Sequence, residues 1–274
     1  MINIMQAGNY KVFDGMVIGA LSITKQCSDP ITAYILTMDL TDLKEDYKPV
    51  SDESIEVLRK IYKDANSESE VIKLDLTEMY KKEFENSPSN ENFYTPYTFL
   101  RLFADQIDGL PDKIIYLDTD VVANGNIKQL YDEDIEGYEI GAVKDYYGRV
   151  FLSPRYCNAG VLLLNMTELR KTKMLNKAMH LCATKKIFLN DQTAIHRLTK
   201  RKKILPRKYN EQHKLKKDTV IRHFSMTLKF FPKLKKQNIK PWNIEGVHNV
   251  LKCHEFDDIL EKWQSLKTQN YKWK

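Results

Sequence analysis

Short apolar runs alternate with longer amphipathic stretches along most of the chain. Six runs predict β-strands because they are rich in Ile, Val, Leu and Tyr and are bounded by polar turns: residues 1–5, 32–36, 70–74, 113–117, 140–143 and 160–165. Residues 13–25 and 52–63 instead carry apolar side chains at helical spacing. Strands that alternate with such helices predict an α/β fold with a mixed, mainly parallel sheet.

A further helix is predicted to begin at Thr95, a suitable N-cap residue, with Pro96 at its first position. Its buried stripe is predicted to consist of Phe99, Leu102 and Phe103. Arg101 falls off this stripe, so the pattern alone is equally consistent with a solvated arginine and with one that faces a ligand.

The run KIIYL at 113–117 ends in Asp118, Thr119 and Asp120. Such an uninterrupted run fits a central strand buried on both faces, and ligands of open α/β sheets bind at the carboxyl ends of such strands. Residues two apart in an extended chain project to the same side, so both carboxylates could bind one cation. Hard oxygen ligands beside a phosphate-bearing substrate favour Mn²⁺ or Mg²⁺. Asp-x-Asp also occurs in ordinary turns, but unpaired carboxylates at a core edge repel each other and are costly to desolvate.

The charge of the chain is divided unevenly along its length. The net charge is +6, yet residues 200–240 alone hold 15 Lys and Arg against Glu211 and Asp218. A basic segment on an otherwise acidic chain indicates an anionic partner, which could be membrane lipid, nucleic acid or a phosphorylated substrate. For any single lysine, a solvated surface position explains the sequence equally well.

Cysteine usage and hydropathy predict a cytoplasmic protein with reduced thiols. The four cysteines lie far apart and form no CxxC pair. No signal peptide is evident, and no apolar run approaches the roughly 18 residues needed to span a bilayer.

Two classes of enzyme place Asp-x-Asp after a buried strand. In phosphatases of the haloacid dehalogenase type the motif lies close to the N-terminus, whereas here it begins at Asp118, and the later lysine and acidic-pair motifs are not evident. In nucleotide-sugar glycosyltransferases the pair holds a metal that binds the donor diphosphate, and further motifs should follow.

Such motifs are present in a consistent order: Asn9–Tyr10, YTPYTFLRLF at 94–103, RYCNAGVLLLN at 155–165, FLNDQTAI at 188–195 and IRHFSMTLKFF at 221–231. With Asp-x-Asp, they resemble glycosyltransferase family 8, the retaining enzymes that include glycogenin and the bacterial lipooligosaccharide galactosyltransferases. The resemblance runs to about Trp242. It implies a single Rossmann-like, nucleotide-sugar-binding domain of the GT-A type over residues 1–242, which includes the basic segment 200–240. A C-terminal helical extension would occupy 243–274.

The resemblance also implies roles for individual residues. Metal binding would fall to Asp118, Asp120 and His223. Donor binding would fall to Asn9, Tyr10, Arg101, Asp118, Thr119, Asp120, Asn158 and Lys229. The catalytic positions would be Asp145, Asp191 and Gln192. Three departures stand out: Ala7 where the family usually has aspartate, Met226 where glycine is usual, and a Pro-Trp pair that comes late, at 241–242.

The implied activity is retaining, metal-dependent transfer of a hexose, glucose or galactose, from a UDP-sugar to a glycan or lipid-linked acceptor. The alternative, motivated by Ala7 and Met226, is an impaired member that binds nucleotide sugar or glycan without turnover. Residues 200–240 would contact an anionic membrane from the cytoplasmic side. Nucleic acid is not an expected partner, because no recognition motif accompanies the basic segment.

Overall fold

A computed structural model of the chain describes residues 1–85, 87, 95–187, 189–229 and 235–268. Its main sheet has seven strands in the order β3-β2-β1-β4-β7-β6-β8. In chain order these are β1 Ile2–Ala7, β2 Ile31–Thr37, β3 Glu70–Asp75, β4 Lys113–Leu117, β6 Ile140–Lys144, β7 Cys157–Asn165 and β8 Lys202–Ile204. All six predicted strands are confirmed.

The sheet is mainly parallel, and β7 is the strand that runs against its neighbours. The pairs β3–β2, β2–β1, β1–β4 and β6–β8 are parallel, whereas β7 pairs antiparallel with both β4 and β6. In the β4–β7 register Leu117 lies opposite Val161. The first residues of β7 therefore lie beside the end of β4, where the two aspartates follow.

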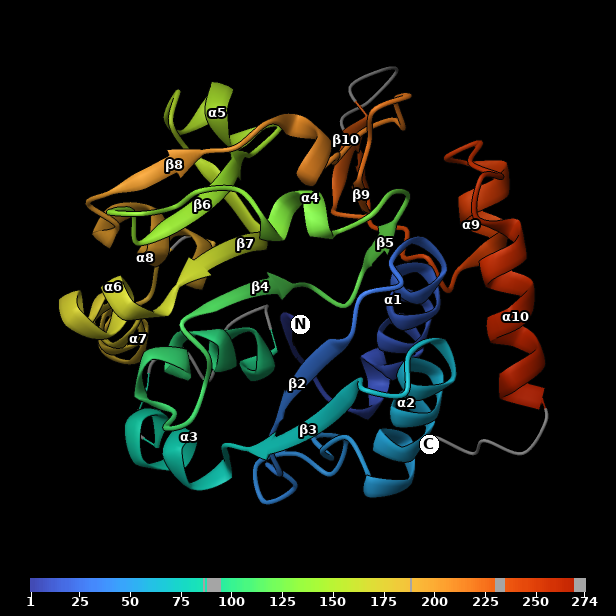
Figure 1. Ribbon diagram of the computed structural model, residues 1–274. Coiled ribbons are helices and arrows are strands. Elements are labelled where there is room, and N and C mark those ends of the chain that lie inside the picture. The colour runs from blue at the N-terminus through green and yellow to red at the C-terminus, as the bar shows by residue number, and fades with distance from the viewer. Residues whose placement is uncertain (86, 88–94, 188, 230–234, 269–274) are drawn as a thin grey trace.

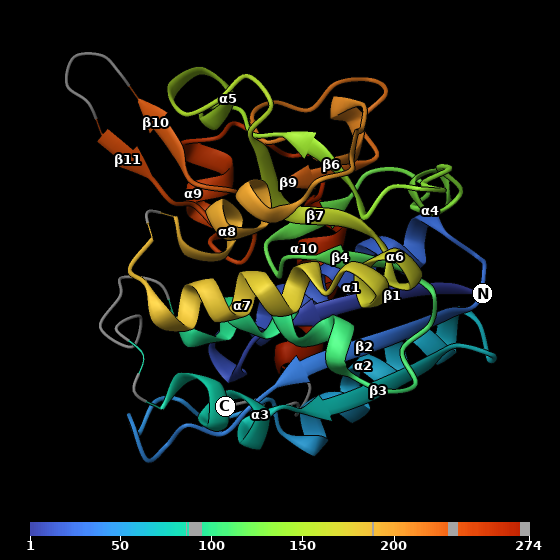
Figure 2. The same ribbon diagram turned by 90° about the vertical axis from the view of Figure 1, so that its left-hand side faces the viewer.

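Helices cover both faces of the sheet (Figures 1 and 2). One face is covered by α1 Phe13–Gln26, α2 Asp52–Ala65, α9 Ile244–Asn249 and α10 Asp257–Thr268. The other face is covered by α3 Thr77–Phe84, η3 Pro96–Gln106, α6 Met166–Thr172, α7 Met174–Thr184 and α8 Asn190–Leu198. Each face has its own hydrophobic core, so the central strands are apolar on both sides.

Strand β4 shows how the sequence meets this requirement. Ile115 and Leu117 enter the core beneath α1, whereas Ile114 and Tyr116 enter the opposite core. Because side chains alternate between the faces of a strand, only an unbroken apolar run can serve two cores. The prediction that this run is buried on both faces is confirmed.

The helix predicted to begin at Thr95 is a 3₁₀ helix, η3, and the Thr95 side chain makes no capping hydrogen bond. The predicted stripe is buried, and Arg101 is buried as well. In a 3₁₀ helix residues three apart share a face, and the Arg101 Nε atom donates to the Thr98 carbonyl. Solvation of Arg101, which the helical pattern left open, is therefore wrong.

Two small sheets complete the end of the molecule beyond β4. In the first, β5 Val121–Ala123 pairs antiparallel with β9 Ile221–His223, which places His223 opposite Val121. In the second, β10 Thr227–Lys229 pairs with β11 Lys235–Gln237. The short helices η1 Tyr10–Val12, α4 Lys128–Tyr131, α5 Gly148–Phe151 and η4 Arg207–Tyr209 lie in connections.

Two polar contacts join the C-terminal helix α10 to α1. The Trp263 indole donates to Asp14, and Lys25 pairs with Asp258. We keep the domain boundary at residue 242 as a proposal. The four cysteines form no disulfide, and all four are buried. No helix in the described ranges is both long and apolar enough to cross a bilayer.

Candidate active site and metal centre

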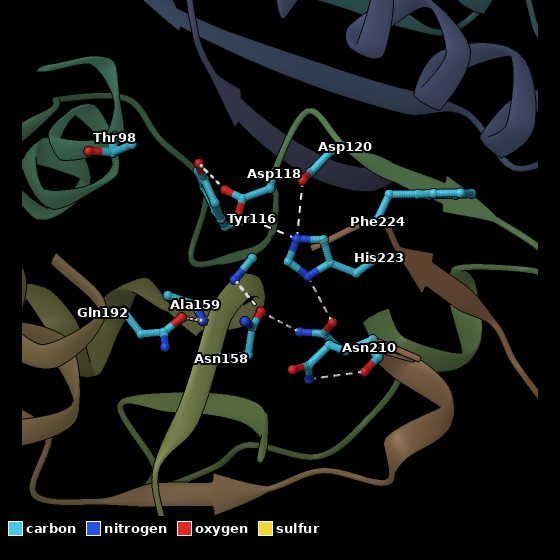
Figure 3. Close-up of polar contacts among 12 residues, drawn as sticks. Thr98, Tyr116, Asp118, Asp120, Asn158, Ala159, Gln192, Asn210, His223 and Phe224 are labelled. Carbon is cyan, nitrogen blue, oxygen red and sulfur yellow. Dashed lines mark hydrogen bonds and ion pairs between the residues drawn. The ribbon is translucent and has the colours of Figure 1, made fainter. Parts of the chain in front are cut away.

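The two aspartates at the end of β4 point toward His223 (Figure 3). The backbone N–H of Asp118 donates to the Gly160 carbonyl at 2.7 Å, which fixes the chain at this point. The Asp118 Oδ1 atom accepts from Arg101 Nη2 at 2.8 Å and from the Tyr116 hydroxyl at 3.1 Å. The Asp118 Oδ2 atom lies 3.8 Å from His223 Nε2.

Asp120 is buried between two basic side chains. Its Oδ1 atom lies 3.1 Å from His223 Nε2, and its Oδ2 atom accepts from Lys240 Nζ at 2.5 Å. Burial alone would raise the pKa of Asp120, but the nearby positive charges of His223 and Lys240 lower the pKa below its usual value. The carboxylate therefore stays ionised, as a metal ligand must.

A chain of amides orients the His223 ring from behind (Figure 3). The Asn158 Nδ2 atom donates to Asp145 Oδ2, and the Asn158 Oδ1 atom accepts from Asn210 Nδ2 at 3.0 Å. This leaves the Asn210 Oδ1 atom, an acceptor, 3.1 Å from His223 Nδ1. Because each amide has one donor end and one acceptor end, the Asp145 carboxylate places a proton on His223 Nδ1. Nε2 is then the ring nitrogen that faces the two aspartates, the position from which a histidine would bind a metal.

Because Gly160 has no side chain, His223 and Asp118 can pack closely against its backbone. A Cβ atom at this position would lie 2.2 Å from His223 Cε1 and 2.7 Å from Asp118 Oδ2. The ligand atoms of Asp118, Asp120 and His223 lie within 4.8 Å of one another. Two carboxylates and one imidazole at this spacing fit a divalent cation such as Mn²⁺ or Mg²⁺.

Arg101 joins the predicted metal ligands to Asp191. Its Nε atom lies 3.2 Å from Asp191 Oδ2, and its Nη1 atom donates to the Ala159 carbonyl at 2.7 Å. Its guanidinium also stacks over the Tyr116 ring, 4.2 Å from the ring centre. Burial raises the pKa of Asp191, and the Arg101 charge offsets part of this rise.

Gln192 is held at both ends of its amide. The Oε1 atom accepts from the Ala159 N–H at 3.0 Å, and the Nε2 atom lies 3.4 Å from Asp145 Oδ2. Asp145 also accepts from the backbone N–H of Gly148 at 2.6 Å, as a turn aspartate would. Both interpretations of Asp145 are therefore compatible: it stabilises a turn and it faces the site.

The residues predicted to bind the nucleotide lie at the end of β1. Asn9 is buried there, whereas the Tyr10 hydroxyl donates to Asp46. Thr119 is held close to α1, because a Cβ atom on Gly15 would lie 2.1 Å from the Thr119 carbonyl oxygen. Lys229 lies in β10, and its side chain is outside the described part of the structure.

The sequence did not lead us to predict two residues of the site, Lys240 and Asn210. Lys240 directly precedes Pro241 and Trp242, so the Lys-Pro-Trp end of the family motif was intact but displaced along the chain. This Lys-Pro-Trp order could have identified Lys240 from the sequence. Asn210 carries no comparable signal, because its role depends on a contact with His223 that only the fold creates.

The fold is shared with solved glycosyltransferase structures of the GT-A type. Two structures of LgtC each align with 99% of this chain over 99% of their own length. One is an active-site mutant, with a TM-score of 0.71 and 16% identity. The other is a galactosyltransferase complex with donor and acceptor sugar analogs, with a TM-score of 0.67 and 18% identity. The sheet is thus that of a GT-A glycosyltransferase.

The sequence defines the family more closely. The model of Glycosyl transferase family 8 matches residues 4–245, so the chain belongs to this family. Glycosyltransferase GlyA of Streptococcus pneumoniae is 40% identical over 80 residues, which are 29% of this chain and 11% of GlyA. Lipopolysaccharide 1,2-glucosyltransferase of Escherichia coli K12 is 32% identical over 134 residues, 44% of this chain and 40% of the relative. The chain thus spans less than half the length of either relative.

Proposed function

We propose that this protein transfers a hexose from a UDP-sugar to an acceptor hydroxyl and retains the anomeric configuration. The observation that carries this proposal is the convergence of Asp118, Asp120 and His223 at the end of β4, with Lys240 beside them. A family 8 chain with this cluster has what a donor diphosphate requires: a cation site and an additional positive charge.

The cation would be Mn²⁺ or Mg²⁺, held by Asp118, Asp120 and His223. When bound, it supplies positive charge that stabilises the negative charge on the leaving UDP. Lys240 can add to this stabilisation, since its ammonium group already lies at the Asp120 carboxylate. Lys229 also remains a proposed diphosphate contact. Thr119, Asn9 and Tyr10 would contact the nucleotide.

The remaining residues would orient the sugar and the acceptor. The hexose would lie among four side chains, those of Arg101, Asn158, Asp145 and Asp191. By holding the sugar in position, they would give the acceptor hydroxyl a fixed target and lower the entropic cost of the reaction. Gln192 is a weak nucleophile, and its amide is already hydrogen-bonded at both ends. We therefore favour attack on the same face. The bond between the anomeric carbon and the UDP oxygen breaks, the acceptor oxygen forms the new bond, and its proton passes to the leaving phosphate.

The donor sugar is proposed to be glucose or galactose, and the acceptor a glycan or a glycolipid. The names of the relatives support this choice, because one is a lipopolysaccharide glucosyltransferase and LgtC is a galactosyltransferase. An impaired family member is the alternative. Met226, one of its motivations, is an exposed side chain.

Contact with an anionic membrane from the cytoplasmic side is proposed for part of the basic segment. Several of its cations already have partners, for example Lys203 with Glu133 and Arg207 with Glu211. Three of its exposed lysines are grouped in the loop after His213: Lys214, Lys216 and Lys217. Reversing these three charges should abolish flotation with anionic vesicles. Hydrolysis of soluble donor should be unaffected.

Asp120→Ala tests the proposed chemistry. Release of UDP should be measured with Mn²⁺ and a panel of UDP-sugars, and the variant should lose at least about 100-fold in rate. Asp132→Ala is the matched control, because Asp132 forms an exposed ion pair with Lys128. Full activity of Asp120→Ala would contradict the assignment. If the native chain binds UDP with Mn²⁺ by calorimetry but releases none from any donor, the impaired alternative is correct.

A further inference from the structure

A second group of metal-binding side chains lies between α9 and α10, at the outer edge of the molecule in Figure 1. His248 belongs to α9, His254 to the connection, and Asp257 is the first residue of α10. The His248 Nε2 atom lies 2.6 Å from Asp257 Oδ1, and the His254 Nδ1 atom lies 3.2 Å from Asp257 Oδ2. The ligand atoms of all three lie within 4.8 Å of one another. We call these residues the C-terminal histidine cluster.

The two imidazole rings are stacked, with centroids 4.4 Å apart and an interplanar angle of 26°. Each ring directs one nitrogen toward the same carboxylate. If both rings were protonated, two positive charges would lie face to face over a single negative charge, and they would repel each other. One divalent ion in place of the two protons would let the neutral rings share the carboxylate as co-ligands.

We propose that His248, His254 and Asp257 bind a structural Zn²⁺ ion that joins α9 to α10. Two imidazole nitrogens and one carboxylate oxygen form a ligand set that suits zinc better than magnesium or calcium. Zinc–ligand distances of about 2.0–2.2 Å in tetrahedral geometry place ligand atoms roughly 3.3 Å apart. His254 Nδ1 and Asp257 Oδ2 already have this spacing, whereas His248 Nε2 lies beside Oδ1 and would shift toward Oδ2.

The cluster is accessible enough to load. The side chains of His248, Asp257 and His254 are 29%, 38% and 62% exposed. An ion can therefore enter from solvent and complete its coordination with water. This openness also distinguishes the cluster from a buried network of hydrogen bonds, which would have no route for an ion and no space for a fourth ligand.

The position of the cluster gives the ion a structural role. Helix α9 begins directly after Lys240, Pro241 and Trp242, and the Asn243 side chain caps it by accepting from the Gly246 N–H. Trp242 packs closely against Gly15 of α1. A zinc ion between α9 and α10 would therefore hold in place α9, the helix that follows the segment that brings Lys240 to Asp120.

Zinc binding to the full chain, without any donor sugar, tests the proposal. After treatment with EDTA and dialysis, Zn²⁺ is titrated in competition with a chromophoric chelator. The Asp120→Asn background removes a ligand of the first centre, so we expect one tight equivalent to remain. Adding His254→Ala should lower the Zn²⁺ affinity of this remaining site by at least about 100-fold. His180→Ala, which removes an exposed histidine on α7, should not weaken it.

A second measurement guards against loss of folding. Zn²⁺ should raise the melting temperature of the native chain and of Asp120→Asn, because a ligand that binds the folded state stabilises it. It should not raise that of the double variant Asp120→Asn/Asp257→Asn. If Asp120→Asn binds no zinc, or if His254→Ala leaves the tight equivalent in place, the proposal is wrong. Neither readout depends on sugar transfer, so failure here leaves the proposed enzyme activity untouched.

Discussion

The two clusters of metal-binding side chains differ in what holds their ligands in place. In the first, which we call the carboxylate centre, Asp118, Asp120 and His223 each have partners outside the trio. These partners come from η3, from the segment before α9 and from the loop that carries Asn210. In the C-terminal histidine cluster the hydrogen bonds run mainly among His248, His254 and Asp257 themselves.

This difference implies different relations between ion and fold. The carboxylate centre is arranged by strand pairing and buried hydrogen bonds, so an ion finds its ligands already oriented. The C-terminal histidine cluster is closed only by its own members, and Lys252 within its connection has a left-handed backbone, with a φ of 54°. We therefore expect an ion to contribute to activity at the first cluster and to stability at the second.

Of the predicted substitution effects, that of Gly160→Ala should be the largest, and it should be confined to the carboxylate centre. The new methyl group would lie 2.2 Å from His223 Cε1 and 2.7 Å from Asp118 Oδ2. We expect UDP release to fall by at least about 100-fold, with a loss of about 1–3 kcal/mol in the free energy of unfolding. Zinc binding at the C-terminal histidine cluster should not change. Gly19→Ala is the control, because its Cβ atom would make only ordinary contacts at 3.6 Å or more. Near-native activity of Gly160→Ala would show that the site does not need His223 and Asp118 to pack closely against residue 160.

Asn210→Ala tests the orientation of the His223 ring. The substitution removes the acceptor at Nδ1 and leaves Asn158 without one of its donors. We expect Mn²⁺ affinity, measured by calorimetry, to fall about 10- to 100-fold. Asn124→Ala, which removes an amide bonded to the Thr219 carbonyl, should leave the affinity unchanged. Equal Mn²⁺ affinities of Asn210→Ala and Asn124→Ala would mean that the contact with Asn210 does not orient the His223 ring for metal binding.

Asp191 should give the network behind the carboxylate centre a pH-dependent stability. Because burial raises the folded-state pKa of Asp191 above its unfolded value, the folded state binds a proton more tightly. Stability is then lost as pH rises through the folded-state pKa. Relative to Asp191→Asn, the native chain should lose stability in urea unfolding as the pH is raised from 4 to 8, with EDTA present. The Asp132→Asn variant, which keeps Asp191, should follow the native chain. An opposite trend for Asp191 would mean that the Arg101 charge outweighs burial.

The sequence predicted some parts of this molecule well for identifiable reasons. The strand before Asp118 was readable because burial on both faces demands an unbroken apolar run. His223 was found through the resemblance, since its motif begins at that residue. Arg101 was harder to place, because helical spacing of 3.6 residues does not describe the 3₁₀ helix that buries it.

Other parts depend on contacts between distant segments. Lys240 reaches Asp120 across 120 positions of sequence, after an interruption of the expected motif. The ligands of the C-terminal histidine cluster are six and three positions apart, and no CxxC pair accompanies the two histidines to complete a common zinc motif. In both cases the chain fold, and not local pattern, creates the proximity.

The reversed direction of β7 has a consequence for how this family member can vary. One strand carries polar residues at its beginning, where Asn158 and Gly160 line the site, and apolar residues afterwards, where Leu163 and Leu164 fill the two cores. A slip of one position against β4 would exchange the faces of the leucines and withdraw the amide from Asn210 at the same time. The proposed activity and the packing of both cores would then fail together, so we expect β7 to tolerate fewer substitutions than β3 at the sheet edge.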